Sequence, residues 1–139
     1  MKRFVLDASV ALAWFVDNPI PPFAQNVERR LVHGEKAFVP ALWLLEVANG
    51  LIVAERRGKL SFAQCALAIE KVRQLLSTVV DISSAQVSLR QNFETARDFN
   101  LTAYDATYLN AARSEHLPLA TLDRQLLEAA IKARIEILS

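Results

Sequence analysis

Short apolar runs alternate along this chain with longer stretches of helical spacing. The short runs are rich in β-branched and aromatic residues and end at polar or turn-forming residues, a pattern typical of buried strands. They predict strands over residues 2–6, 37–40, 78–82, 119–122 and 135–138. In the intervening stretches apolar residues recur every three or four positions, which predicts helices. The expected helices cover residues 10–16, 23–32, 41–57, 61–76, 83–97, 103–115 and 123–133.

The predicted helices carry suitable residues at their ends. Ser61 and Thr102 precede helical stretches and can cap their first turns. Gly34 and Gly58 follow helical stretches, where glycine commonly ends a helix. Because strands alternate with helices and no hairpin signal is present, the sequence predicts an α/β fold. We expect a parallel sheet covered by helices on both faces.

Length and composition predict one domain spanning residues 1–139, large enough to fold without disulfides. The hydrophobic content of 53% is high, so either the core is large or some apolar surface serves a partner, such as a second copy of the chain. The single cysteine, Cys65, falls on an apolar helical stripe with Phe62, Ile69, Val72 and Leu76. We expect a core residue there rather than a reactive thiol.

A cytoplasmic location without a membrane segment is expected. Lys2 and Arg3 precede an apolar run that imitates a signal peptide, but Asp7 interrupts this run. The longest apolar stretch, residues 41–54, contains Glu46 and Asn49. It is also shorter than the roughly 20 residues that span a bilayer.

The charges nearly cancel, with 16 Lys and Arg against 15 Asp and Glu and a formal net charge of +1. Any binding of nucleic acid must therefore depend on local patches. Candidate basic patches are residues 29–30, residues 56–59, and Lys132 with Arg134. Ordinary solvated helix ends are the alternative explanation for each patch.

Two aspartates directly follow predicted strands: Asp7 follows the first and Asp123 the fourth. Ligands of open parallel sheets gather at the carboxyl ends of the strands, so both are candidate site residues. The alternative is that each only caps a helix, because aspartate is a good N-cap residue.

Two further acids stand in helices. Glu46 interrupts a strongly apolar stretch, where an unpartnered charge is costly, and Asn49 lies on nearly the same helix face. The alternative is that Glu46 reaches water or pairs with an arginine. Asp105 lies in the first turn of its predicted helix, where a negative charge is favourable without any further role.

Taken together, the four acids indicate a metal site. Carboxylates brought close together raise one another's pKa and destabilise the fold unless a cation compensates their charge. Oxygen ligands suit Mg²⁺ or Mn²⁺, and the contexts of His33 and His116 do not suggest a zinc site. Such a metal suits phosphodiester hydrolysis, since it lowers the pKa of bound water and neutralises the phosphate. No glycine-rich phosphate loop or Ser-His-Asp arrangement competes with this interpretation.

Four segments, in this order, carry a family resemblance: Val-Leu-Asp-Ala-Ser at residues 5–9, Pro40 with Glu-Val-Ala-Asn-Gly-Leu at 46–51, Tyr-Asp-Ala-Thr-Tyr-Leu at 104–109 and Pro-Leu-Ala-Thr-Leu-Asp at 118–123. On these segments the chain resembles the PIN-domain ribonucleases, and more narrowly the VapC toxins of bacterial toxin–antitoxin pairs. The resemblance implies a three-layer α/β/α fold with a central, mostly parallel five-stranded sheet.

The resemblance also implies roles for individual residues. Four acids match the family's metal ligands: Asp7, Glu46, Asp105 and Asp123. Ser9, Asn49 and Thr121 resemble its supporting polar residues. The implied activity is Mg²⁺- or Mn²⁺-dependent cleavage of RNA by a growth-inhibiting toxin, with a cognate antitoxin as partner and a homodimer as the assembly. Asp81 and Asp98 receive no role.

Three other classes of protein share parts of this pattern. Haloacid dehalogenase-like phosphatases need a second aspartate two residues after the first, where this chain has Ser9. Receiver domains need an aspartate after the third strand and a lysine after the fifth, whereas Asp81 lies within the third predicted strand and no lysine follows the last. A catalytically inactive PIN-like module that binds RNA or protein is disfavoured because all four acids are present.

Overall fold

One parallel sheet forms the centre of the molecule. The computed structural model describes residues 2–139. Its strands are β1 (Arg3–Leu6), β2 (Lys36–Val39), β3 (Val80–Ile82) and β4 (Leu119–Ala120), in the order β3-β2-β1-β4. All three strand pairs are parallel, and Val5 lies opposite both Phe38 and Leu119. The interior position of β1 therefore places its carboxyl end beside the ends of β2 and β4.

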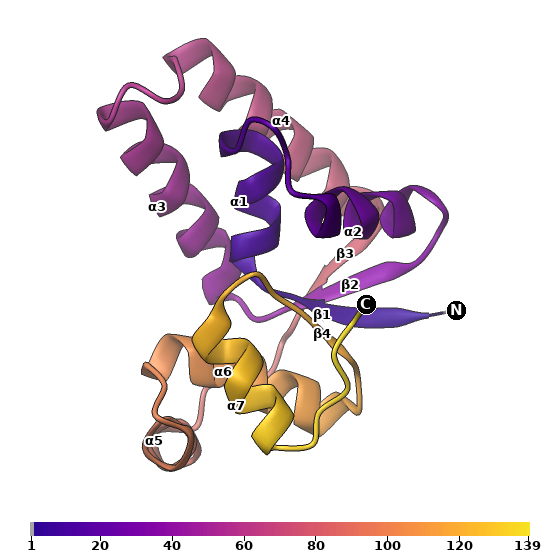
Figure 1. Cartoon of the computed structure of the whole chain (residues 1–139), viewed down its shortest axis with the longest axis vertical. Coiled ribbons are helices and arrows are strands. Elements are labelled where there is room, and N and C mark those ends of the chain that lie inside the picture. The colour runs from indigo at the N-terminus through magenta and orange to yellow at the C-terminus, as the bar shows by residue number, and fades with distance from the viewer. Residues whose placement is uncertain (1) are drawn as a thin grey trace.

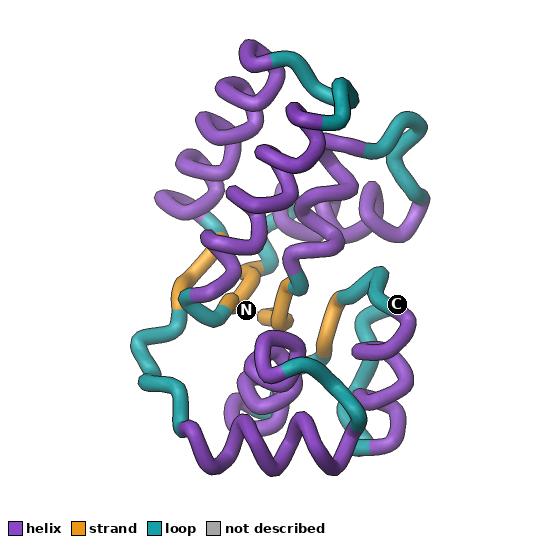
Figure 2. The backbone as a smooth tube through the Cα atoms, turned by 90° about the vertical axis from the view of Figure 1, so that its left-hand side faces the viewer, coloured by secondary structure: helices purple, strands orange, loops and turns teal. Residues whose placement is uncertain are grey.

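Helices cover both faces of the sheet, as Figures 1 and 2 show. One layer contains α1 (Ala8–Val16), α2 (Pro22–Val32), α3 (Leu42–Arg56) and α4 (Phe62–Thr78), and the other contains α5 (Leu89–Phe99), α6 (Ala103–Glu115) and α7 (Arg124–Lys132). The α3–α4 pair extends beyond the sheet at the upper left of Figure 1. This arrangement confirms the predicted three-layer α/β/α fold with a parallel sheet.

The central strands β1 and β2 are mostly apolar because both of their faces are buried. Phe4, Val5 and Leu6 of β1 have no solvent exposure, and Ala37 and Val39 of β2 have none either. The helices on either side complete one hydrophobic core, which includes the fully buried ring of Trp43 on α3. Burial of these strands fixes where their carboxyl ends emerge.

Most helix boundaries agree with the sequence pattern. Ser61 begins α4 with a capping box, in which its hydroxyl accepts a hydrogen bond from the Gln64 backbone and the Gln64 side chain accepts one from Ser61 N. Thr102 caps α6 through a hydrogen bond from Asp105 N at 3.1 Å. Both caps confirm the predicted positions.

The predicted start of the fifth helix at residue 83 is wrong. Helix α5 begins at Leu89, and its cap is Ser88, whose hydroxyl accepts a hydrogen bond from Gln91 N. Ser83 instead donates its backbone N–H to Val39 O at 2.8 Å and binds Ala85 N with its hydroxyl. Serine side chains compete in this way with helix formation, and residues 83–88 form no helix.

The predicted fifth strand over residues 135–138 is not formed. In the described part of the chain, Ile137 makes a single parallel bridge to Leu119. Two hydrogen bonds hold it, from Leu119 N to Glu136 O and from Leu138 N to Leu119 O, each 2.9 Å long. Because β4 contains only two residues, it offers too short an edge for a full strand. The sheet therefore has four strands within residues 2–139.

Buried amides attach α5 to α6. Asn110 accepts a hydrogen bond from Thr95 at 2.9 Å and donates one to Asn92 Oδ1 at 3.0 Å. Asn92 in turn donates to the carbonyl of Ala103, the first residue of α6, at 3.0 Å. These satisfied groups fix the start of α6, where Asp105 stands.

The cysteine prediction is confirmed, although the stripe around it is only partly buried. Cys65 is buried, and its thiol lies 3.7 Å from Leu51 O. Val72 is buried as well, but Phe62 and Ile69 are 80% and 59% exposed. The outer face of α4 therefore presents large apolar side chains to solvent.

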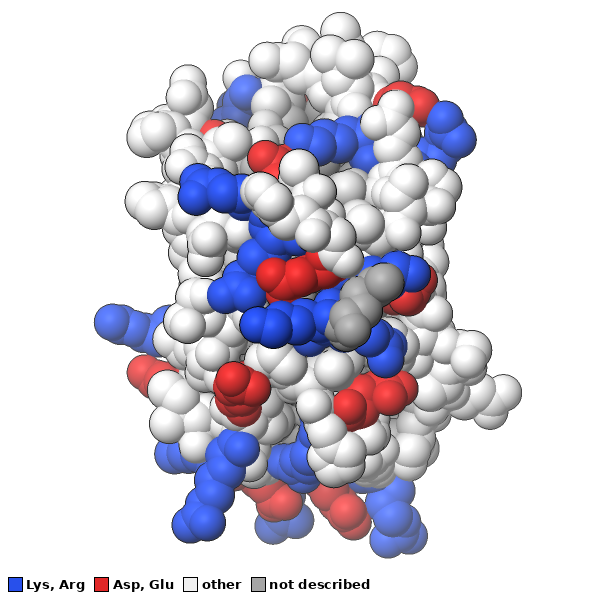
Figure 3. Space-filling model, turned by 90° about the vertical axis from the view of Figure 1, so that its right-hand side faces the viewer, with Lys and Arg blue, Asp and Glu red and all other residues white. Residues whose placement is uncertain are grey.

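Figure 3 views the face opposite the carboxyl ends of the strands, where basic and acidic side chains are intermixed. This mixture agrees with the net charge of +1. None of the helices described combines the length and the apolar character that a bilayer crossing requires.

Truncation of β1 tests the importance of the central strand. Replacing the fully buried Leu6 with alanine leaves a cavity beside the sheet. Leu6→Ala is expected to lower the free energy of unfolding by about 2–5 kcal/mol, measured by urea denaturation. The control Leu67→Ala, at a position that is 71% exposed on α4, should change it by less than about 0.5 kcal/mol. Equal losses in the two variants would contradict the proposed core.

Candidate metal centre

A cleft at the carboxyl ends of the strands brings all four predicted acids together. Its volume is about 470 Å³, and Asp7, Glu46, Asp105 and Asp123 are among the residues that line it. Asp7 follows β1, Asp123 follows β4, Glu46 comes from α3 and Asp105 from the start of α6. The cleft therefore lies between the two helical layers. The carboxyl ends of the strands, which carry Asp7 and Asp123, are turned toward the viewer in Figure 2.

Asp7 is the most deeply buried of the four acids, with 5% exposure. Its Oδ2 accepts hydrogen bonds from the hydroxyls of Ser9 at 2.6 Å and Thr121 at 2.8 Å. Its side chain makes no capping hydrogen bond to α1, so capping does not account for this aspartate. Its backbone N–H bonds to Ala120 O at 2.9 Å, which ties Asp7 to the end of β4.

Thr121 and Ser9 also fix the loop that carries Asp123. Thr121 Oγ1 accepts a hydrogen bond from Asp123 N at 2.9 Å, and Ser9 Oγ accepts one from Leu122 N at 3.0 Å. Asp123 itself caps α7 by accepting a hydrogen bond from Leu126 N at 3.2 Å. The capping alternative therefore holds for Asp123, and the same residue also lines the cleft.

Glu46 has a partner that sequence analysis missed. The hydroxyl of Tyr108, a fully buried residue of α6, donates a hydrogen bond to Glu46 Oε1 at 2.5 Å. No salt bridge to Glu46 exists among the described residues, so the arginine alternative is wrong. Tyr108 is three residues after Asp105, and this spacing places both on one side of α6. The spacing is the signal that could have identified Tyr108.

The carboxylates act on one another electrostatically. Burial, and next the charges of Asp123 and Asp7, raise the pKa of Asp105 to about 6. Burial is also the main cause of the raised pKa of Glu46, and the charges of the other three acids add to it. Their mutual influence shows that the four acids share one region of negative potential.

Burial and hydrogen bonds also shift the pKa values of Asp7 and Tyr108. Burial raises the pKa of Asp7 and the charge of Asp123 adds to this, while the hydrogen bonds from Ser9 and Thr121 lower it. Burial, and next the hydrogen bond to Glu46, raise the pKa of the Tyr108 phenol, so it stays a hydrogen-bond donor. The hydroxyls therefore favour ionised carboxylates in a cleft that otherwise disfavours them.

The donor set suits a hard divalent cation, because carboxylate oxygens in an electronegative cleft are the ligands that Mg²⁺ and Mn²⁺ prefer. As they stand within residues 2–139, no three Asp, Glu, His or Cys side chains form a group that could hold a metal ion. Holding an ion therefore requires the side chains to draw closer together. Partly exposed carboxylates such as Glu46 and Asp105 can do this by rotation about their side-chain bonds.

The predicted supporting residues lie at the acidic cleft, whereas the two acids without an assigned role lie elsewhere. Ser9 and Asn49 line the cleft, and Thr121 contacts Asp7. Asp81 is exposed on β3, and Asp98 is exposed on α5. Neither lines the acidic cleft.

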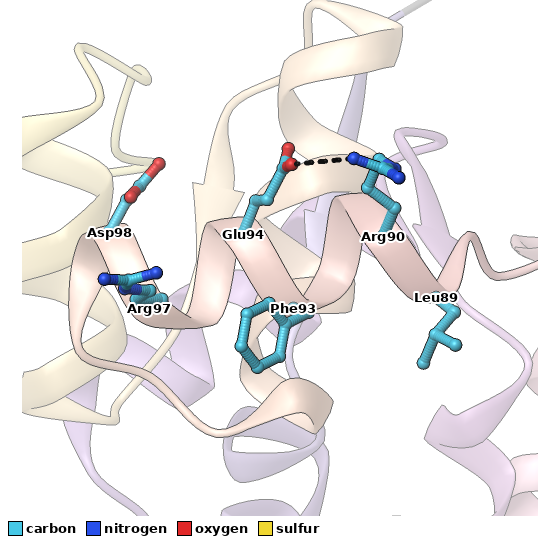
Figure 4. A pocket seen from close by; sticks show the side chains of 6 residues that line it. All are labelled: Leu89, Arg90, Phe93, Glu94, Arg97 and Asp98. Carbon is cyan, nitrogen blue, oxygen red and sulfur yellow. Dashed lines mark ion pairs between the residues drawn. The ribbon is translucent and has the colours of Figure 1, made fainter.

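A larger cleft, of about 660 Å³, lies along the outer side of α5. Figure 4 shows Leu89 and Phe93 on one side of this helix and the weak Arg90–Glu94 ion pair, 3.9 Å long, on the other. The charged side chains that line this larger cleft alternate in sign and all come from α5. It therefore lacks the converging carboxylates that distinguish the acidic cleft.

The raised pKa of Asp105 predicts a dependence of stability on pH. Its carboxyl titrates near 3.8 when unfolded and near 6 when folded. Its contribution to stability is therefore full below pH 3.8 and is lost as the pH rises through 6. In EDTA, the free energy of unfolding should fall more steeply between pH 5 and pH 7.5 for the unaltered chain than for Asp105→Asn, as urea denaturation would show. The control Asp98→Asn should keep the steep dependence, and parallel curves for all three proteins would contradict the raised pKa of Asp105.

Comparisons with known proteins agree with this geometry. The PIN domain family model matches residues 4–132. Ribonuclease VapC3 of Pyrobaculum aerophilum is 31% identical over 126 residues, covering 91% of this chain and 93% of that protein. Ribonuclease VapC9 of Mycobacterium tuberculosis is 32% identical over 122 residues, covering 88% of this chain and 87% of that protein.

Solved structures show the same fold. A crystal structure of a Pyrobaculum aerophilum protein superposes with a TM-score of 0.71 at 26% identity, covering 92% of this chain and 84% of the other. A domain of a functionally unknown protein from Methanocaldococcus jannaschii gives a TM-score of 0.56 at 17% identity, covering 100% of this chain and 92% of the other, and shares the fold alone. With the family model matched from β1 to the end of α7, this chain belongs to the PIN domain family.

Proposed function

We propose that this protein is a metal-dependent endoribonuclease and the growth-inhibiting toxin of a toxin–antitoxin pair. The convergence of four carboxylates in one cleft is the observation that carries the proposal. The names of the similar VapC ribonucleases support RNA as the substrate.

The four acids are the residues that would hold the divalent cation, either Mg²⁺ or Mn²⁺. A cation held there would lower the pKa of a bound water and neutralise charge on the scissile phosphate. The protein's part is to keep the carboxylates ionised and correctly placed. Ser9 and Thr121 do this for Asp7, and Tyr108 does it for Glu46.

Asn49 contributes at the rim of the cleft. It is exposed on α3 one turn beyond Glu46 and lines the same cleft. Its amide can donate to a phosphate oxygen or accept from a water. This role is weaker than that of the buried hydroxyls, because no hydrogen bond to another described residue fixes the Asn49 side chain.

A cognate antitoxin and a second copy of the chain complete the proposed assembly in the cytoplasm. Large apolar side chains that stay exposed beside the acidic cleft support a protein partner there: Leu45 is 74% exposed and Tyr104 is 66% exposed. Exposed apolar surface of this kind commonly marks protein interfaces.

A PIN-like module that binds RNA or protein without cleaving it is the alternative function. It would share the fold but not need an electronegative cleft. The raised pKa values of Asp105 and Glu46 favour the nuclease, because such a cleft destabilises the fold unless it serves a cation.

Cleavage assays test the proposed activity. Single-stranded RNA should be cleaved in Mg²⁺ or Mn²⁺, and EDTA should abolish cleavage. Asp7→Asn and Asp105→Asn should each lower kcat/KM by at least about 100-fold, because loss of a metal ligand removes several kcal/mol of stabilisation of the transition state. The control Asp98→Asn should keep full activity. Cleavage that survives EDTA, or survives both substitutions in folded protein, would contradict the proposal.

Thr121 offers a separate test of positioning. Thr121→Val keeps the side-chain shape but removes the hydrogen bonds to Asp7 and Asp123 N. The metal concentration for half-maximal cleavage should rise by about 10–100-fold, as for other residues that orient metal ligands. Thr121→Ser should restore it, because serine supplies the hydroxyl. If valine and serine behave alike, Thr121 does not position the carboxylate.

A further inference from the structure

A second groove adjoins the acidic cleft. Its volume is about 230 Å³, and it runs between α1 and α3, which lie side by side in Figure 1. Ser9, Leu12 and Gly50 line both the groove and the acidic cleft. The two hollows therefore adjoin at these three residues, with the carboxylates in the cleft and the groove further along α3.

Helices α1 and α3 pack closely at the point where the two hollows meet. A Cβ atom at Gly50 would lie 2.4 Å from the Leu12 side chain, far inside van der Waals contact. Glycine therefore lets α1 and α3 approach closely at this point. A larger residue would push Leu12 out of its place at the junction of the groove and the cleft.

The far end of the groove is basic. Arg57 and Lys59 line it, and both are exposed. No ion pair found within residues 2–139 involves either side chain, so both charges are available to a ligand. Asp17 lines the groove as well, which leaves one excess positive charge among these three residues.

This basic end is too distant to serve the scissile phosphate. Arg57 is 11 residues after Glu46, and a rise of 1.5 Å per residue places it about 16 Å further along the helix axis. A phosphate held by Arg57 therefore belongs to a nucleotide some distance along the strand from the cleavage point.

We propose that Arg57 and Lys59 form a subsite for the phosphate backbone of single-stranded RNA, whose chain lies in the α1–α3 groove while the carboxylates act on another phosphate. This assignment rests on the proposed ribonuclease function. The groove's excess positive charge and its position beside the acidic cleft favour a polyanion that extends out of the active site. Contacts of this kind bind RNA without regard to sequence and weaken as salt is added.

Binding measurements test the subsite without requiring cleavage. Fluorescence anisotropy would follow a labelled single-stranded RNA of about 12 nucleotides bound to the Asp105→Asn protein in Mg²⁺. Adding Arg57→Gln and Lys59→Gln should weaken binding at least about tenfold, because each removes a charge-assisted contact. The plot of log affinity against log salt should also become shallower by about 1.4, or about 0.7 per phosphate contact.

Two controls separate the subsite from a general effect of charge. Arg29→Gln with Lys132→Gln removes the same charge from residues that line neither hollow, and it should leave RNA binding nearly unchanged. Asp17→Asn should strengthen binding, because it removes a negative charge from the groove. Binding unaffected by the Arg57 and Lys59 substitutions, as for a groove that serves only a protein, would overturn the subsite. Equal losses in the Arg29 and Lys132 control would overturn it too.

Cleavage kinetics keep the two proposals distinguishable. The Arg57 and Lys59 substitutions, made in the otherwise unaltered chain, should raise KM for the long RNA while kcat and the cleavage of a trinucleotide stay unchanged. If these substitutions leave KM for the long RNA unchanged, the subsite alone would be overturned. Binding that depends on them, in a protein that cleaves no RNA, would support the subsite and contradict the ribonuclease function.

Discussion

The burial and mutual repulsion of carboxylates held in one cleft are the constraint on which the rest of this structure depends. The parallel sheet makes the repulsion unavoidable, because the ends of the adjacent strands β1 and β4 bring Asp7 and Asp123 to the same edge. Helices α3 and α6 then add Glu46 and Asp105 from opposite layers. A fold gains nothing in stability from such an arrangement, and this cost is the argument for the proposed cation site.

The hydroxyl network around Asp7 shows how the fold supports this cluster. Ser9 and Thr121 come from segments 112 residues apart, yet both donate to the same oxygen of Asp7. Each hydroxyl also accepts a backbone N–H of the loop that leads to Asp123. The network therefore couples the position of one carboxylate to that of another. Tyr108 plays the equivalent part for Glu46 across the two helical layers.

Much of the fold and the site could be predicted from the sequence, for identifiable reasons. Alternating strands and helices predicted the three layers, and acids after buried strands predicted the cleft. Long-range partners could not be predicted: the contact of Tyr108 with Glu46 joins residues 62 positions apart. The other differences between the predicted and observed elements arise from competing local interactions. Ser83 continued its pairing with β2 instead of starting a helix, and the two-residue β4 could not hold a full fifth strand.

Crystals of the protein soaked in Mn²⁺ offer the most direct test of the central claim. An anomalous difference map locates manganese independently of any assumption about its ligands. The account predicts a strong peak in the acidic cleft, within about 2.0–2.3 Å of oxygen atoms from at least two of its four carboxylates. Manganese bound elsewhere while this cleft holds only water, or a Glu46 or Asp105 side chain directed away from Asp7, would contradict it.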